Sequence, residues 1–177
     1  MQTWVALLRG INVGGRNILP MAKLRSLLES QNCRDVRTYI QSGNVVFRSA
    51  AKSRSKLSES LLDAIESEFV FRPGLMLLTA GEFLGAKACS PFSKAVAEPK
   101  TLHFFFLESE AKTPDIQSIA ELAAPTETFQ LTGRVFYLHA PDGIGRSKLA
   151  ANVERKLGVA ATARNYATVE KISEMLS

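Results

Sequence analysis

The sequence of 177 residues lacks the features that define several large classes of protein. Its longest apolar runs, such as residues 102–107, are far shorter than the ~20 residues of a membrane-spanning helix, so we expect no membrane partner. No basic stretch followed by an apolar segment opens the chain, as a secretory signal would require. The two cysteines, Cys33 and Cys89, lie far apart and form no CxxC pair. This pattern excludes a disulfide framework and predicts free thiols in the reducing cytoplasm.

Patterns for catalysis and metal binding are also scarce. Both histidines, His103 and His139, fall in apolar, strand-like segments that are typical of structural histidines. No cluster of His and Cys has the spacing of a metal site, and no pair of carboxylates has a spacing that indicates acid–base catalysis. A neighbouring Arg34 would lower the pKa of the Cys33 thiol, but a buried or idle cysteine is the simpler interpretation. We therefore expect no metal and no cofactor, and whether the protein is an enzyme is left open.

Composition and length indicate a folded protein with an uneven charge distribution. With 46% hydrophobic and 22% charged residues the chain is not mainly disordered, and its length allows one ordinary domain or two small ones. Residues 1–57 hold ten Lys and Arg residues against two acidic ones, residues 58–133 hold five against eleven, and residues 134–177 hold seven against four. Two basic ends around an acidic middle favour an anionic partner, although charges that happen to cluster on a solvated surface give the same pattern.

The hydrophobic pattern of the first half predicts the order β-α-β-β-α-β. Four segments have the apolar runs or the alternation of strands: residues 3–8, 36–40, 45–47 and 75–79. Apolar residues at helical spacing follow Pro20 and recur at residues 57–69. A turn at Ser42-Gly43-Asn44 joins the two middle strands, and Gly43 supplies the positive φ that this turn needs.

The second half repeats this order. Strands are expected at residues 101–107, 127–131, 135–139 and 159–162. Helices are expected at residues 115–124 and 149–157, followed by an extra closing helix at residues 169–176. A Thr132-Gly133-Arg134 turn mirrors the turn of the first half.

The repeated order predicts an α+β fold, a tandem duplication of a ferredoxin-like β-α-β-β-α-β unit with antiparallel sheets and an extra C-terminal helix. We expect a first subdomain at residues 1–80 and a second, with the closing helix, at residues 101–177. The connecting segment, residues 81–100, is expected to hold one short helix near Glu82.

Four motifs spread over nearly the whole chain carry a family resemblance. The first two are LRGINVGGRN at residues 8–17 and RTYIQSGNVVF at residues 37–47, and the second two are RSKL at residues 146–149 and TARNYATV at residues 162–169. These motifs resemble the family called domain of unknown function 1697. The resemblance implies a soluble, bacterial-type protein with two ferredoxin-like subdomains. It implies no activity, because the family is named for the lack of one.

The loop at residues 9–17 is the strongest candidate for a binding site. Gly10, Gly14 and Gly15 lie between a strand and a helix, where successive backbone N–H groups can bind an anion. The corresponding connection in the second half, residues 108–113, is shorter and has no glycine, which favours a function for the first loop. A tight turn with close strand–helix packing is the alternative reason for the glycines. The side-chain donors of this loop are Arg9, Asn12, Arg16 and Asn17.

The loop is not a Walker-type phosphate loop. In such a loop a Lys reaches the terminal phosphates and a Ser or Thr hydroxyl binds Mg²⁺. Arg16 and Asn17 stand at those two positions. The antiparallel architecture also differs from the parallel sheet in which such loops occur.

The predicted topology brings further donors to this loop. Strands one and two of the unit run in the same direction, so the loop after the first and the turn after the second share one end of the unit. We therefore expect Gln41, Ser42 and Asn44 beside the glycine loop, with Arg72 nearby. Such a set of donors suits a phosphate or a carboxylate. Asn44 is equally explained as a turn residue that tolerates a left-handed backbone.

A second candidate anion site lies in the second half, where the glycine-rich residues 143–145 precede a predicted helix. Its candidate donors are Arg146, Ser147, Lys148, Arg164 and Asn165. The alternatives are that Ser147 is the N-cap of that helix, that Arg164 pairs with Asp142, and that Asn165 caps the closing helix by way of Thr168.

Four function classes remain. The first is binding of a phosphorylated or nucleotide-like small molecule, or another anion, at the glycine loop. The second is binding of nucleic acid through its phosphate backbone, because residues 102–107 are apolar on both faces and disfavour base stacking on an open sheet. The third is an enzyme whose site assembles only in the fold, and the fourth is a structural or interaction protein. We favour the first, and the oligomeric state is left open.

Overall fold

The computed structural model describes residues 1–177. Contacts within the chain divide it into two units, the first made of Met1–Gly85 with Lys171–Ser177 and the second of Ala86–Glu170. The C-terminal residues thus belong to the first unit, where the Arg37 guanidinium donates a hydrogen bond to the Met175 carbonyl. The subdomain boundaries at residues 80 and 101 stay a prediction.

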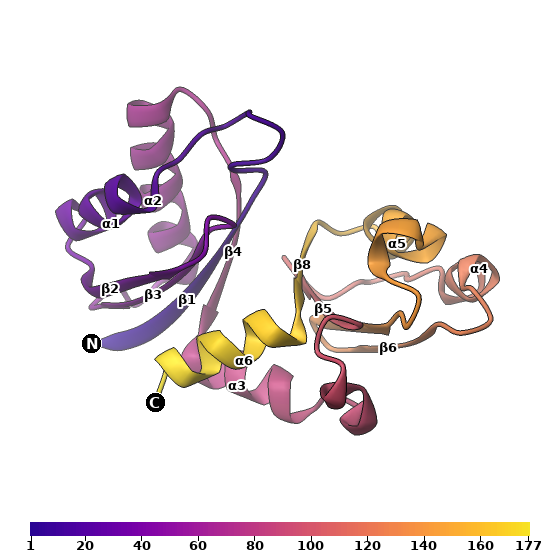
Figure 1. The fold of residues 1–177 in the computed structure, drawn as a ribbon. Coiled ribbons are helices and arrows are strands. Elements are labelled where there is room, and N and C mark those ends of the chain that lie inside the picture. Colours follow the sequence, from indigo (N-terminus) through magenta and orange to yellow (C-terminus); the bar gives the residue numbers. More distant parts are fainter. The chain divides into compact units, whose positions relative to one another are not determined.

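The first unit has the predicted β-α-β-β-α-β order (Figure 1). Its elements are β1 (Gln2–Arg9), α1 (Met21–Ser30), β2 (Arg34–Tyr39), β3 (Asn44–Ser49), α2 (Arg54–Phe69) and β4 (Gly74–Thr79). The strands form an antiparallel sheet in the order β2-β3-β1-β4, with α1 and α2 on one face. This strand order confirms the prediction of a ferredoxin-like unit.

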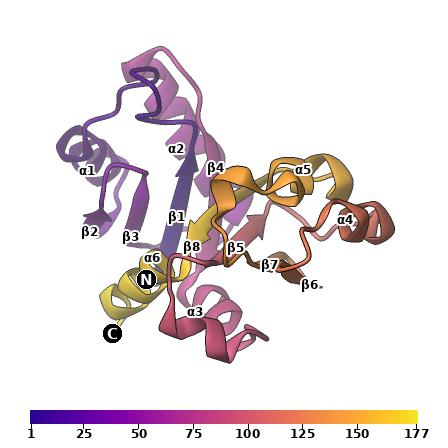
Figure 2. The same ribbon diagram turned by 45° about the vertical axis from the view of Figure 1, so that its right-hand side comes forward.

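The second unit repeats the same topology (Figure 2). Its elements are β5 (Leu102–Leu107), α4 (Ile116–Leu122), β6 (Thr128–Thr132), β7 (Val135–His139), α5 (Lys148–Leu157) and β8 (Ala161–Asn165). The strands form an antiparallel sheet in the order β6-β7-β5-β8, and α4 and α5 pack on one face. The duplication is therefore confirmed.

Three segments differ in detail from the sequence expectations. The connection holds two helices, α3 (Ala80–Ala88) and the 3₁₀ helix η1 (Ser93–Ala97), where one was expected. Strand β8 begins later than residue 159, because Gly158 ends α5 in a left-handed conformation with φ +67°. The closing helix α6 (Tyr166–Met175) begins earlier than expected, directly after β8. A further 3₁₀ turn, η2 (Ile144–Arg146), precedes α5.

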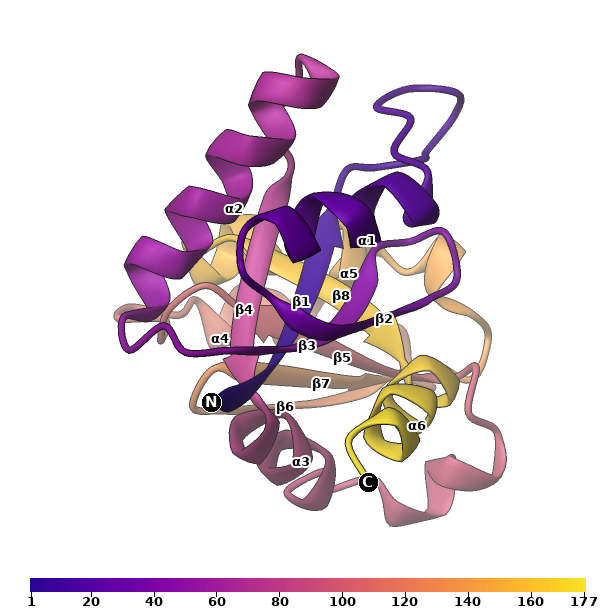
Figure 3. The ribbon, with the colours of Figure 1, turned by 90° about the vertical axis from the view of Figure 1, so that its left-hand side faces the viewer.

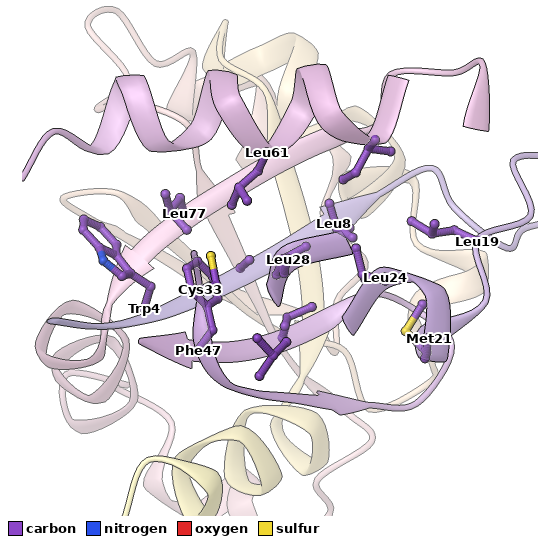
Figure 4. Close-up of a cluster of buried hydrophobic side chains, with 14 of the residues drawn as sticks. Trp4, Leu8, Leu19, Met21, Leu24, Leu28, Cys33, Phe47, Leu61 and Leu77 are labelled. Carbon is purple, nitrogen blue, oxygen red and sulfur yellow. The ribbon is translucent and has the colours of Figure 1, made fainter. Parts of the chain in front are cut away.

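The spacing of apolar residues accounts for the core of the first unit. Helix α2 buries Leu57, Leu61 and Ile65 at four-residue spacing, and β1 contributes alternate residues from Trp4 to Leu8. Figure 4 shows Trp4, Leu8 and Leu61 between the helices and the sheet, together with Leu24 and Leu28 of α1. Each fully buried aliphatic side chain contributes ~1.5–3 kcal/mol relative to an exposed one, so this cluster stabilises the unit.

The central strand of each sheet is buried on both faces. In β1, Val5 and Leu7 lie on the face opposite α1 and α2, yet both are buried. In β5, Phe104 and Phe106 lie on the face opposite α4 and α5 and are buried as well. The expectation that residues 102–107 are covered on both sides is confirmed, and neither of these central strands offers an open face on which bases could stack.

The β2–β3 turn depends on close packing around Gly43. This residue has φ +78°, and a Cβ there would lie 2.6 Å from the Leu8 Cβ and 2.7 Å from the Ile11 Cδ1. In the corresponding turn of the second unit, Gly133 also has a positive φ, +54°, but a Cβ would meet nothing within 4 Å. Gly43 therefore combines a conformational and a steric requirement, and Gly133 has only the first.

We expect Gly43→Ala to lower the free energy of unfolding by about 2–4 kcal/mol, because left-handed strain adds to overpacking. The matched control Gly133→Ala should cost about 1 kcal/mol, because only the strain applies. Urea unfolding followed by circular dichroism measures both losses. Equal losses would contradict the steric role of Gly43.

Candidate anion-binding site

The glycine loop is a short β-hairpin, residues 10–17, which we call the hairpin arm (Figure 3). Gly14 and Gly15 have φ values of +57° and +73°, and the Arg16 N–H donates to the Val13 carbonyl at 3.0 Å. These values define a type I′ turn, which two consecutive glycines favour. The Asn12 N–H donates to the Asn17 carbonyl at 3.1 Å and closes the hairpin. The arm therefore does not run directly into the helix as expected, and residues 18–20 separate it from α1.

The Asn12 carboxamide fixes the arm to its surroundings. Its Nδ2 donates to the carbonyls of Leu19 at 3.0 Å and Gln41 at 2.8 Å, and its Oδ1 accepts from the Leu19 N–H at 2.8 Å. The Asn17 Nδ2 donates to the Gly10 carbonyl at 2.8 Å. Both asparagines have positive φ, which Asn tolerates better than most residues. They shape the loop, and their side chains are already occupied.

The hairpin turn lies beside the arm, as the topology predicts. The Leu8 N–H donates to the Gly43 carbonyl at 2.8 Å, and Gln41 accepts the bond from Asn12. Asn44 is buried and donates to the Tyr39 carbonyl and to the Ser42 Oγ, both at 3.0 Å. Asn44 thus supports the turn from inside, while Gln41 and Ser42 are exposed.

Several donors of the arm remain directed to solvent. Arg9 and Arg16 are exposed, and no bond within the chain engages the Arg16 guanidinium or the N–H groups of Gly14 and Gly15. Helix α1 begins after Pro20, which provides no side-chain cap to its first turn. Residues 1–28 contain four basic residues and no Asp or Glu. The arm therefore presents one cation, Arg16, and the two N–H groups of Gly14 and Gly15 to solvent, with no carboxylate nearby in the sequence.

Arg72 does not join this set of donors. Its guanidinium bonds three carboxylates of α2, those of Glu59 at 2.5 Å, Asp63 at 2.7 Å and Glu66 at 2.9 Å. The bonds to Asp63 and Glu66 raise the pKa of Arg72 above its usual value. The charge of Arg72 is thus compensated within the chain, and its guanidinium is not available as a donor to a ligand at the arm.

The candidates of the second unit do not come together at one site. Arg164 lies on the opposite face of the sheet from α5, because Ala163, its neighbour in β8, packs on the α5 side. Its guanidinium is buried and donates to the Thr162 Oγ1 and the Ala163 carbonyl, both at 2.8 Å. Burial lowers the pKa of Arg164 to about 10, so it stays charged at neutral pH. The alternative that Arg164 pairs with Asp142 does not hold, because Arg164 is buried whereas Asp142 is exposed and accepts a hydrogen bond from the Thr126 hydroxyl.

Two other candidates of the second unit are helix caps. The Ser147 Oγ accepts from the Ala150 N–H at 2.9 Å and caps α5, and the Asn165 Oδ1 accepts from the Thr168 N–H at 3.0 Å and caps α6. Arg146 and Lys148 are exposed on either side of Ser147. The structural alternatives for Ser147 and Asn165 therefore hold.

Burial determines the chemistry of two other reactive side chains, Cys33 and His103. Cys33 is buried, and burial raises the pKa of its thiol to about 11, so the proximity of Arg34 does not activate it. His103 is also buried, and burial lowers its pKa. No three His, Cys, Asp or Glu side chains are placed to hold a metal ion. None of the helices combines the length and the hydrophobicity that crossing a bilayer requires.

Comparisons with known proteins identify the family of the chain. A family model described as "Protein of unknown function (DUF1697)" matches residues 1–137. Among solved structures, the conserved bacterial protein SP0830 from Streptococcus pneumoniae has a TM-score of 0.75 and 25% sequence identity to this chain, with 99% of each chain covered. No curated protein matches. The family resemblance is confirmed over the first two motifs, while the motifs at residues 146–149 and 162–169 lie outside the matched residues. The match brings no activity with it.

The two cysteines differ in environment, which predicts different reactivities. Cys33 is buried in the core of the first unit and Cys89 is exposed. We expect a thiol reagent at pH 8 to label Cys89 rapidly and Cys33 only when the protein unfolds. Cys33→Ser should lower the free energy of unfolding by about 1–3 kcal/mol, because it buries a hydroxyl, and the control Cys89→Ser by less than about 0.5 kcal/mol. Rapid labelling of Cys33 in folded Cys89→Ser protein would contradict this.

Proposed function

We propose that this chain, which belongs to the DUF1697 family of proteins of unknown function, binds an anionic ligand at the hairpin arm of its first unit. The ligand class we favour is a small molecule that carries a phosphate. The observation that carries the proposal is the preformed arm, on which an exposed Arg16 stands beside two N–H groups that have no partner in the chain.

The chemistry of the arm suits a phosphate or carboxylate. A guanidinium presents several N–H groups in a plane and can bind two oxygens of an oxyanion at once. The N–H groups of Gly14 and Gly15 add neutral donors, and a glycine lacks the side chain that would keep an anion from the backbone. Arg9, Gln41 and Ser42 lie around the base of the arm and complete the set of polar groups.

Binding of nucleic acid is the second candidate, supported by the ten basic residues among residues 1–57. With both faces of the central strands buried, such binding would rest on the phosphate backbone rather than on stacked bases. The dependence of binding affinity on salt concentration distinguishes the two candidates. Between 50 and 200 mM salt, a backbone binder should lose about 10³-fold in affinity, and a site for one small anion much less.

The proposal includes a cytoplasmic location. It is supported by the two unpaired thiols, Cys33 and Cys89, since a reducing compartment keeps such thiols free.

Arg16→Ala tests the site directly. We expect it to raise the dissociation constant for inorganic phosphate, pyrophosphate or AMP by roughly 10- to 100-fold, because a bond to a charged group contributes ~1.5–3 kcal/mol. Titrations followed by amide chemical shifts should move Gly14 and Gly15 in the wild type. The thermal midpoint should hardly change, because the side chain is exposed and has no partner.

Arg146→Ala is the matched control, because Arg146 is an exposed arginine in a glycine-rich loop of the second unit. It should bind these probes as the wild type does. If Arg16→Ala retains full affinity while Arg146→Ala loses it, the ligand binds in the second unit and the proposed site is wrong.

A further inference from the structure

Exposed aliphatic side chains gather at the end of the first unit that carries the hairpin arm, which we call the arm end. Of the eight large hydrophobic side chains that are exposed in the whole chain, four belong to loops at this end. We call these four the aliphatic crown: Val13 (68% exposed), Ile18 (56%), Ile40 (50%) and Val70 (90%). Single exposed aliphatic residues are ordinary, but a group of them marks an interaction surface.

The sheet register explains why these loops share one end. Strands β1 and β2 finish there and β3 and β4 begin there, with Leu7 paired to Asn44 and Arg9 paired to Gly74. Three crown residues are sequence neighbours of the residues that the Asn12 carboxamide joins. Val13 follows Asn12 in the chain, and Ile18 and Ile40 are the direct neighbours of Leu19 and Gln41, to which that carboxamide is bonded.

Two crown residues occupy backbone conformations that β-branched side chains avoid. Ile40 has φ +49° and Val70 has φ +61°. Val70 is the C-cap of α2, and the C-cap of the corresponding helix α5 is Gly158 with φ +67°. A glycine therefore meets the same geometric requirement without strain in the second unit. At the corresponding end of that unit, Ile116 (39% exposed) is the one exposed large hydrophobic residue.

The charged residues around the crown indicate which class of partner could bind there. On the arm side of the crown, Arg16 pairs with Val13 across the hairpin, Arg9 is exposed, and residues 1–28 contain no carboxylate. On the other side, Val70 follows α2, where three carboxylates share the single guanidinium of Arg72, so the cations that attract an acidic partner are those of the arm side. None of the exposed large hydrophobic side chains is aromatic, so the surface lacks the rings on which nucleic-acid bases stack. Aliphatic contacts next to cations fit a polypeptide that carries both aliphatic and acidic side chains.

We propose that the aliphatic crown docks an acidic polypeptide segment whose aliphatic side chains cover Val13, Ile18, Ile40 and Val70. This inference rests on the proposed function, since the same Arg16 and N–H groups of Gly14 and Gly15 that bind a small phosphate compound then also bind a carboxylate of the segment. The aliphatic contacts supply affinity that a free phosphate lacks, because each removes apolar surface from water.

The test is selection of peptides from a displayed random 12-residue library on the full-length protein. The expected peptides combine Asp or Glu with Leu, Ile or Val. Binding of the best peptide should fall about tenfold in Val70→Gly and in Ile40→Asn, since each removes one aliphatic contact. Both replacements suit a left-handed backbone, so these variants should keep the fold, and Val70→Gly should melt at a higher temperature than the wild type. Ile116→Asn is the matched control and should bind as the wild type does.

The outcomes separate this inference from the function on which it rests. Arg16-dependent binding of inorganic phosphate with no peptide selected would leave the proposed function standing and overturn the docking of a polypeptide. Peptides that bind equally well to Val70→Gly and Ile40→Asn would also overturn it. An oligonucleotide that binds in place of any peptide, with a loss in the crown variants, would show a nucleic-acid partner instead. Crown-dependent binding of peptides without acidic residues, unaffected by Arg16→Ala, would overturn the acidic partner, and the phosphate titration of Arg16→Ala would still decide the anion site.

Discussion

The carboxamide of Asn12 is the interaction on which the arm end of the first unit depends. Its three hydrogen bonds join the arm to the segment before α1 and to the β2–β3 turn. An amide offers its donors and acceptor in a fixed plane, so these bonds restrict the relative positions of all three segments. A ligand at Arg16 therefore meets a surface that is ordered before binding, and little of its binding free energy is lost to ordering the loop.

The duplication provides an internal reference for this end of the molecule. Both units have the same strand order, and both need a left-handed residue at the end of their second helix. The second unit meets that need with Gly158, whereas the first uses Val70 and adds an eight-residue arm. The preference for glycine at a left-handed helix C-cap is thus followed in the second unit and not in the first. Departures of this kind are expected where a surface serves binding rather than stability.

Hydrophobic periodicity was sufficient to predict the order of the elements, since alternating and four-residue spacings dictate which faces are buried. Sequence patterns predicted less about the loops, because they do not show which hydrogen bonds the loop side chains form. The consecutive glycines of the arm indicated a turn. The sequence alone did not show that the side-chain amides of Asn12 and Asn17 would form hydrogen bonds to the backbone of the chain and so be unavailable to a ligand. The alternation of side chains along a strand could have predicted that Arg164 lies on the other face of the sheet from its neighbour Ala163, and therefore away from α5. The three carboxylates on Arg72 and the exposure of Ile40 and Val70 depend on tertiary packing, which no local pattern reveals.

The cationic and aliphatic features of the arm end reinforce one another in the proposed complex. An exposed ion pair contributes only ~0–1 kcal/mol, because water and salt screen it. A partner that covers the aliphatic crown excludes water from around Arg16, and a Coulomb interaction strengthens as the effective dielectric constant falls. A free phosphate leaves the crown uncovered, so its bond to Arg16 stays screened. A segment that contacts both Arg16 and the crown should therefore bind more tightly than a small phosphate compound, which uses the same guanidinium without the aliphatic contacts.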